Sequence, residues 1–171
     1  MGGDADRLCR AESMNLAPTH EQVESGLNDK DANVRKAWAR RMDFTPTPEQ
    51  AERGLKDSRW IVRLTWITRT DWTPTYKQIN SGLLDNDWVI RKEWVNRTDW
   101  TPTSAQVLRG LDDESTSVRM AWVRRVDFTP TQEQIERGLK DPSSIIRDAW
   151  MERLMRTQES ILDGERFERS L

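Results

Sequence analysis

The chain repeats itself with a period of 28 residues, and this period constrains the fold more than any other feature. Prolines mark the period at positions 18, 46, 74, 102 and 130, without a gap. Periods of about 20–50 residues are typical of solenoids and other arrays, in which each unit buries its apolar face against its neighbours. The sequence therefore predicts an array of five units, which span residues 17–44, 45–72, 73–100, 101–128 and 129–156.

Nine of the 28 positions carry one residue type in all five units. Numbered from the first residue of each unit, they are proline at position 2, threonine at 3, glutamine at 6, glycine at 10, leucine at 11, aspartate at 13, arginine at 19, tryptophan at 22 and arginine at 25. Residues that recur in every unit are most simply explained by a shared folding requirement. We therefore assign them to the scaffold and look for function at the positions that vary.

The composition agrees with an array that has a thin core. Hydrophobic residues make up 35% of the chain and charged residues 33%, which disfavours a globule with one thick core. Nine tryptophans at regular spacing argue against disorder, because each offers a large surface that can be buried. The formal net charge of −2 creates no overall field that would draw the chain to nucleic acid or to anionic lipid.

Each unit is predicted to form two short helices. Threonine at position 3 and glutamine at position 6 have the spacing of a capping box, and Pro48 stands where the first helical residue is expected. Apolar residues at positions 7 and 11 form an i,i+4 stripe on the first helix, as do those at positions 18 and 22 on the second. We expect the glycine at position 10 to lie near the end of the first helix and, with a short loop, to close it, and the aspartate at position 13 to cap the second.

The second-helix pattern resembles the short HEAT-like repeat family. An aspartate followed by Val-Arg or Ile-Arg and then by a large residue, as in "DANVRKAW", carries this resemblance. It implies an all-α solenoid whose second helices line a concave groove. It also implies a hydrogen-bonded ladder between units, made by the pairs Asp29/Arg35, Asp57/Arg63, Asp85/Arg91, Asp113/Arg119 and Asp141/Arg147. The chain departs from the family at position 22, where tryptophan replaces the usual small residue.

The two ends are predicted to cap the array. Residues 1–16 fit the second half of a unit and are expected to form an N-terminal half-repeat cap. Residues 157–171 are expected to form a C-terminal cap and tail. Residues 1–171 are thus predicted to be a single solenoid domain.

The candidate binding residues lie on one stripe of the second helices, at positions 16, 20 and 24. Under the resemblance this stripe faces the groove, where an apolar and aromatic centre would be flanked by basic ends. Exposed tryptophan and arginine are enriched in binding hot spots. An open alternative is that the two tryptophans only pack on a neighbouring helix. The ten candidates are Trp60, Trp88, Leu64, Lys92, Met120, Lys36, Arg40, Arg124, Thr68 and Asn96.

Catalysis finds little support in the sequence. His20 and Cys9 are the only residues of their types, so Cys/His metal clusters and Ser-His or Cys-His nucleophile pairs cannot form within the chain. No glycine-rich phosphate loop is present, and no cofactor is predicted. A remote alternative is a DNA glycosylase, because some of these enzymes are built from HEAT-like repeats and use a groove aspartate beside tryptophan. Asp87 next to Trp88 is the one match in residue type.

The leading hypothesis is a non-enzymatic solenoid that holds, scaffolds or inhibits a protein partner. The rival hypothesis is a nucleic-acid binder, because the second helices carry more Lys and Arg than Asp and Glu and the tryptophans could stack on bases. No segment reaches the roughly 20 apolar residues of a membrane span, and the first residues lack the apolar run of a secretory signal. With Cys9 as the only cysteine, these features predict a cytoplasmic protein with no membrane partner.

Overall fold

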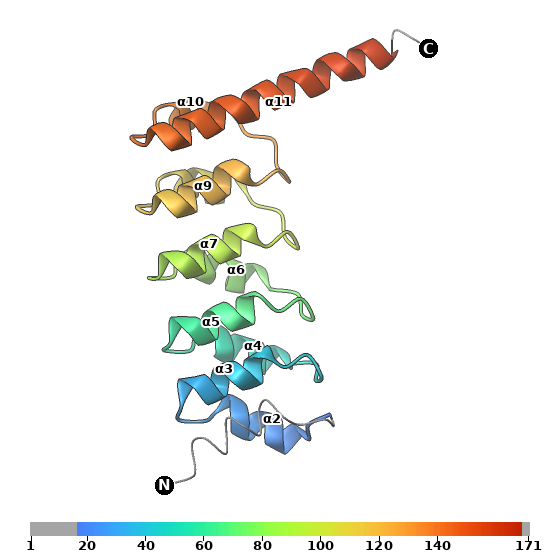
Figure 1. The fold of residues 1–171 in the computed structure, drawn as a ribbon, viewed down its shortest axis with the longest axis vertical. Helices are drawn as coiled ribbons and strands as arrows, with labels where there is room; N and C mark the ends of the chain where they lie inside the picture. The colour runs from blue at the N-terminus through green and yellow to red at the C-terminus, as the bar shows by residue number, and fades with distance from the viewer. Residues whose placement is uncertain (1–16, 169–171) are drawn as a thin grey trace. The chain divides into compact units, whose positions relative to one another are not determined.

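The computed structural model describes the main chain of residues 17–168 and the side chains of residues 17–156. Within these residues the chain forms ten helices and no strands, so the predicted all-α helical-repeat solenoid is confirmed (Figure 1). The first helices of the five units are α2 (His20–Leu27), α4 (Pro48–Leu55), α6 (Tyr76–Gly82), α8 (Ser104–Leu111) and α10 (Gln132–Leu139). The second helices are α3 (Ala32–Arg40), α5 (Trp60–Ile67), α7 (Trp88–Asn96), α9 (Thr116–Arg124) and α11 (Ser144–Glu168).

The chain divides into two compact parts, one ending at Trp94 and the other beginning at Val95, so that α7 belongs to both. In the first part, α2 packs on α3, α4 packs on α5, and α3 contacts α5. In the second part, α8 packs on α9, α10 packs on α11, and α9 contacts α11. The assignment of residues 1–171 to a single domain stays a prediction. The expected N-terminal cap, residues 1–16, lies outside the described residues, and α11 runs without a break past residue 156.

All five first helices begin with the predicted capping box. The threonine Oγ1 accepts the N–H of the glutamine three residues later at 3.2–3.3 Å. The glutamine Oε1 accepts the threonine N–H at 2.7–2.9 Å. Two of the otherwise unpaired N–H groups at each helix start are thereby satisfied. The local sequence alone is sufficient to place these helix starts.

The position-10 glycine is the last or next-to-last residue of each first helix, near the helix end as predicted, but the prediction that it closes the helix is wrong. None of the described glycines has a positive φ, and Gly26, for example, lies inside α2, with Asn28 as the C-cap. A Cβ atom built on any of the five glycines would overlap the indole of the tryptophan at position 22 of the same unit. Glycine is therefore needed for close approach between the two helices, which also explains why position 22 accommodates tryptophan where the family usually has a small residue. The five pairs are Gly26/Trp38, Gly54/Trp66, Gly82/Trp94, Gly110/Trp122 and Gly138/Trp150.

The predicted capping role of the position-13 aspartate is also wrong in detail. The N-cap of α3 is Asp31, two residues later, and the equivalent N-caps of α5 and α9 are Arg59 and Ser115. The position-13 carboxylate instead accepts the N–H of the residue two positions on, at 2.8–2.9 Å, in all five units. This Asx turn shapes the loop that enters the second helix.

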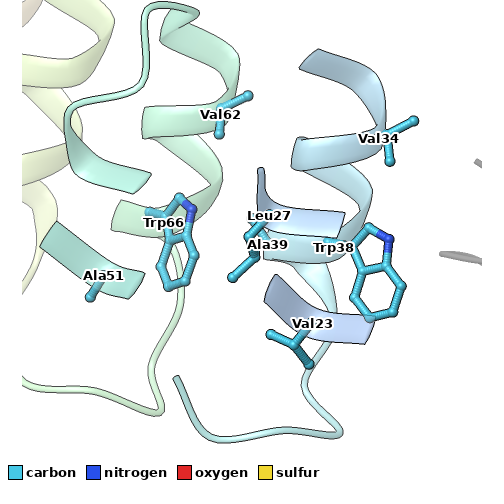
Figure 2. Packing of buried hydrophobic residues seen from close by; sticks show 8 residues of the cluster. All are labelled: Val23, Leu27, Val34, Trp38, Ala39, Ala51, Val62 and Trp66. Atoms are coloured by element: carbon cyan, nitrogen blue, oxygen red, sulfur yellow. The ribbon is translucent and has the colours of Figure 1, made fainter. Parts of the chain in front are cut away.

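A continuous apolar core joins the first two repeats. In the first part it contains Trp38 and Trp66, which are 5% and 1% exposed. Figure 2 shows the indole of Trp66 in the space between the helices that carry Ala51 and Ala39. The same cluster draws residues from α2, α3, α4 and α5, so the first two repeats share one core, as expected for a repeat array.

Candidate protein-binding surface

The invariant aspartates and arginines form the ladder that the resemblance implies. The Arg35 guanidinium donates to both carboxylate oxygens of Asp57 in the next unit, at 2.6 and 2.8 Å, and to the main-chain oxygen of Asp29 in its own unit at 2.8 Å. The side-chain partner is therefore the aspartate 22 residues ahead, whereas the aspartate six residues back offers its carbonyl. The same geometry joins Arg63 to Asp85 and Arg119 to Asp141. These residues link units and are engaged in the scaffold.

The ladder makes the stability of the protein depend on pH. Burial alone would raise the pKa of Asp57, but hydrogen bonds from the Arg35 guanidinium and from the Arg59 N–H outweigh it and hold the pKa below its ordinary value. A lowered folded-state pKa contributes stability that is complete above the unfolded-state pKa, about 4, and is lost as the pH falls through the folded-state value.

We therefore expect the stability difference between the wild type and Asp57→Asn to be largest near neutral pH and to shrink as the pH falls below about 4. Urea unfolding at a series of pH values measures this difference. Asp112→Asn is the control, because Asp112 pairs with Arg137 at an exposed site where such pairs contribute little. A stability difference between the wild type and Asp57→Asn that stays constant down to acid pH would contradict the attribution of this pH dependence to the Asp57 carboxylate.

The arginines at position 25 form a second link between units. The guanidinium of Arg69 is buried and donates to the carbonyl oxygens of Ala39 and Arg41 at 2.6 Å and of Phe44 at 3.1 Å, all in the preceding unit. It also lies 4.8 Å from the centre of the Phe44 ring. Arg125 and Arg153 repeat these contacts in the second part, and burial lowers the pKa of Arg153. The recurrence of these arginines in every unit predicts their role in the scaffold, but it does not predict their carbonyl partners.

The invariant tryptophans do not form a stacking platform for bases. Those at position 22 are between 0% and 5% exposed, and each is packed against the glycine described above. A ligand cannot reach these rings while the helices stay packed. Any aromatic contact with a partner has to come from the tryptophans at other positions.

Two of those tryptophans are exposed on the second helices. Trp60 is the first residue of α5 and Trp88 the first residue of α7, and they are 42% and 44% exposed. The ion pair from Arg63 to Asp85, at 2.7 Å, ties α5 to the loop that leads into α7. The two rings therefore occupy equivalent places on neighbouring second helices.

Seven of the ten predicted residues lie on the second helices of the first part of the chain. One helical turn beyond the tryptophans, Leu64 and Lys92 are half-buried, and the Lys92 Nζ lies 5.8 Å from the centre of the Trp88 ring. We define the second-helix face as the stripe on α3, α5 and α7 that is formed by Lys36, Arg40, Trp60, Leu64, Thr68, Trp88 and Lys92.

The other three predicted residues belong to the second part of the chain. Asn96 and Arg124 are exposed there, and Met120 is half-buried. A single stripe through all ten residues, and the concave groove that it would line, stay predictions.

One basic residue at the edge of the second-helix face is not among the ten predicted residues. Arg59 is exposed, immediately precedes Trp60, and is an N-cap residue without a side-chain capping bond. The signal was present in the sequence, because the equivalent N-cap in α3 is the aspartate Asp31, whose side chain does cap its helix. An arginine in this place serves no capping function and is free to meet a ligand.

The structure gives Asp87 a local structural role. Its carboxylate accepts the N–H of Val89 at 2.9 Å at the start of α7, and its own N–H donates to Asp85. The residue match to a glycosylase site is thus explained by helix capping. Among the described residues, no group of three or more His, Cys, Asp or Glu side chains is arranged to hold a metal ion.

A scan against protein families matches two stretches of the chain to a HEAT repeat associated with sister chromatid cohesion. The matches cover residues 20–37 and 132–150, which begin at the same position of the first and fifth units and run from the first helix into the second. The match supports the resemblance of the units to HEAT-like repeats. The match supports a general role as a protein-interaction scaffold. Searches of the curated proteins and of the solved structures gave no match.

No helix among the described residues combines the length and the apolar character needed to cross a membrane.

Proposed function

We propose that this HEAT-like repeat chain binds a protein partner through its second-helix face, with Trp60, Leu64 and Trp88 as the apolar centre. The exposure of the two tryptophans on neighbouring helices is the observation that supports this proposal most strongly. Tryptophan is among the residues most enriched in binding hot spots, where it fills a pocket on the partner. The role is non-enzymatic: the chain holds, scaffolds or inhibits its partner, in the cytoplasm.

A comparison among the repeats indicates that the two exposed tryptophans are not required for folding. The same helix position holds Ala32, Thr116 and Ser144 in the first, fourth and fifth repeats, and all three repeats have the same helix pair. A large ring is therefore not needed there to form the repeat. Keeping two such rings partly in water is unfavourable, which supports a role outside folding.

Binding of nucleic acid is the alternative, supported by the basic residues Lys36, Arg40 and Lys92 on the same face. It predicts an affinity that falls steeply with salt concentration, because bound phosphates release counterions. We favour a protein partner because Leu64, a residue that cannot stack on a base as an aromatic ring does, lies between the two lysines at the centre of the face.

A pulldown from a lysate, with and without nuclease, tests the proposal. The bait is the tagged full chain, compared with Trp60→Ala/Trp88→Ala and with a control, Tyr76→Ala/Leu84→Ala. The control removes two side chains that are 65% and 59% exposed but lie outside the second-helix face. We expect a protein that is retained by the wild type and the control after nuclease treatment and lost by the tryptophan variant.

Recovery of nucleic acid, or of proteins that disappear after nuclease treatment, would favour the alternative. Equal recovery by all three baits would exclude the second-helix face as the binding site. Thermal unfolding of each bait shows whether any loss of binding comes from loss of fold.

A further inference from the structure

The charges on the second-helix face indicate which kind of protein segment it binds. We propose that the partner segment is acidic and carries two apolar side chains that meet Trp60 and Trp88. This inference rests on the proposed function and specifies its ligand.

Three of the four basic residues on or beside this face have no acidic partner among the described residues of the first part. Among residues 17–94, no acidic side chain pairs with Lys36, Arg40 or Arg59, and Lys92 has one contact, 3.3 Å from Nζ to a carboxylate oxygen of Glu93. The ladder arginines of α3 and α5, Arg35 and Arg63, are already matched by the aspartates of the next repeat. An excess of positive charge therefore remains.

The acidic residues at the starts of these helices are occupied in capping. The Asp31 carboxylate accepts the N–H of Asn33 at 2.8 Å, and the Asp87 carboxylate accepts the N–H of Val89 at 2.9 Å. Each also meets the positive end of a helix dipole, which compensates its charge. A ligand that approaches the second-helix face consequently meets basic and apolar groups.

These groups form two rows across the helices. The first row is Ala32, Trp60 and Trp88, and the second, one helical turn or about 6 Å further along, is Lys36, Leu64 and Lys92. A complementary segment has apolar side chains along one edge and carboxylates along the next. The pattern of apolar and charged groups thus specifies the orientation of the bound segment as well as its composition.

The spacing of the helices limits where the apolar side chains of the ligand can stand. Packed neighbouring helices lie about 8–10 Å apart, so the two tryptophans are separated by about this distance. Residues i and i+3 of a polyproline II segment are about 9 Å apart, and residues i and i+7 of an α-helix about 10.5 Å. Residues i and i+2 of a β-strand, about 7 Å apart, fall short.

Selection from a displayed library of random peptides, with the full chain as bait, tests this proposal. The peptides are about 12 residues long, because a segment of that length can span several helices. Three baits are used: the wild type, Trp60→Ala/Trp88→Ala, and the charge reversal Lys36→Glu/Lys92→Glu. Thermal unfolding confirms that each bait is folded. We expect the wild type to enrich peptides with two apolar residues, three or seven positions apart, accompanied by Asp or Glu.

These peptides should lose binding to the tryptophan variant and bind the charge-reversed variant about tenfold more weakly, since two attractive pairs become repulsive. Enrichment of neutral or basic peptides whose binding still depends on the tryptophans would overturn the proposal that the ligand is acidic and leave the proposed function intact. If no peptide depended on the tryptophans, both would be overturned. Tight, tryptophan-dependent binding of a single-stranded DNA oligonucleotide, with no acidic peptide enriched, would overturn the peptide proposal and identify nucleic acid as the ligand.

Discussion

Gly54→Ala is expected to destabilise the protein by about 2–3 kcal/mol, although it adds only one methyl group. The new Cβ would overlap the indole of Trp66, which is buried and only 1% exposed. Either α4 and α5 separate or the ring leaves its position, and both disturb the core shared with the preceding repeat. Urea unfolding followed by tryptophan fluorescence measures the change in free energy of unfolding.

Two further variants test whether the clash with Trp66 is the cause. Trp66→Leu creates space beside position 54, so Gly54→Ala should cost less in that background than in the wild type, giving a clear coupling energy. Ser25→Ala, at an exposed site in α2 directly before the equivalent glycine Gly26, should change stability by no more than about 0.5 kcal/mol. Strict additivity of the two core substitutions would contradict the proposed contact.

Arg69→Met is expected to destabilise the protein by about 3 kcal/mol or more, because it leaves buried carbonyl groups without donors. The guanidinium donates to three carbonyl oxygens of the preceding repeat, and methionine keeps only the apolar stem. Arg69→Lys should recover little of this loss, since one ammonium cannot reproduce the forked geometry. Thermal and urea unfolding measure both variants.

The matched control is Arg53→Met, which removes an arginine of the same repeat from an exposed ion pair with Glu24. Exposed pairs contribute about 1 kcal/mol or less, so this variant should remain close to the wild type. If Arg53→Met and Arg69→Met were equally destabilising, charge in general, rather than the buried carbonyl contacts, would explain the result.

The helices could be predicted from the sequence because their signals are local. Capping boxes such as Thr47 with Gln50 lie within one helical turn, and the apolar stripes follow the i,i+4 spacing of a single helix. Five aligned copies of the same pattern removed the ambiguity of a single short helix. The positions of the helices therefore needed no knowledge of tertiary contacts.

The roles of the invariant glycine and aspartate could not be obtained in the same way. Gly54 faces Trp66 across two helices, and the side chain of Asp57 is held by Arg35 from the preceding repeat. Recurrence shows that such residues matter, but it does not show which recurring residues face each other. Local rules consequently assigned both to helix ends, where glycine and aspartate are common.

The candidate site was predicted only in part for a related reason. The exposed tryptophans stand out because other repeats fill the same position with small residues. The relation of Met120 and Arg124 to Trp60 depends instead on small rotations between successive repeats, which accumulate along the array and leave no simple pattern in the sequence.

The affinity of the protein captured by the wild type, measured by calorimetric titration, tests the central claim most directly. Trp60→Ala/Trp88→Ala should weaken binding by about 2 kcal/mol or more, or roughly 30-fold, as expected for an aromatic hot spot. Tyr76→Ala/Leu84→Ala, whose side chains lie outside the second-helix face, should bind like the wild type. An affinity of the tryptophan variant within about twofold of the wild type would contradict the assignment of this face as the binding site.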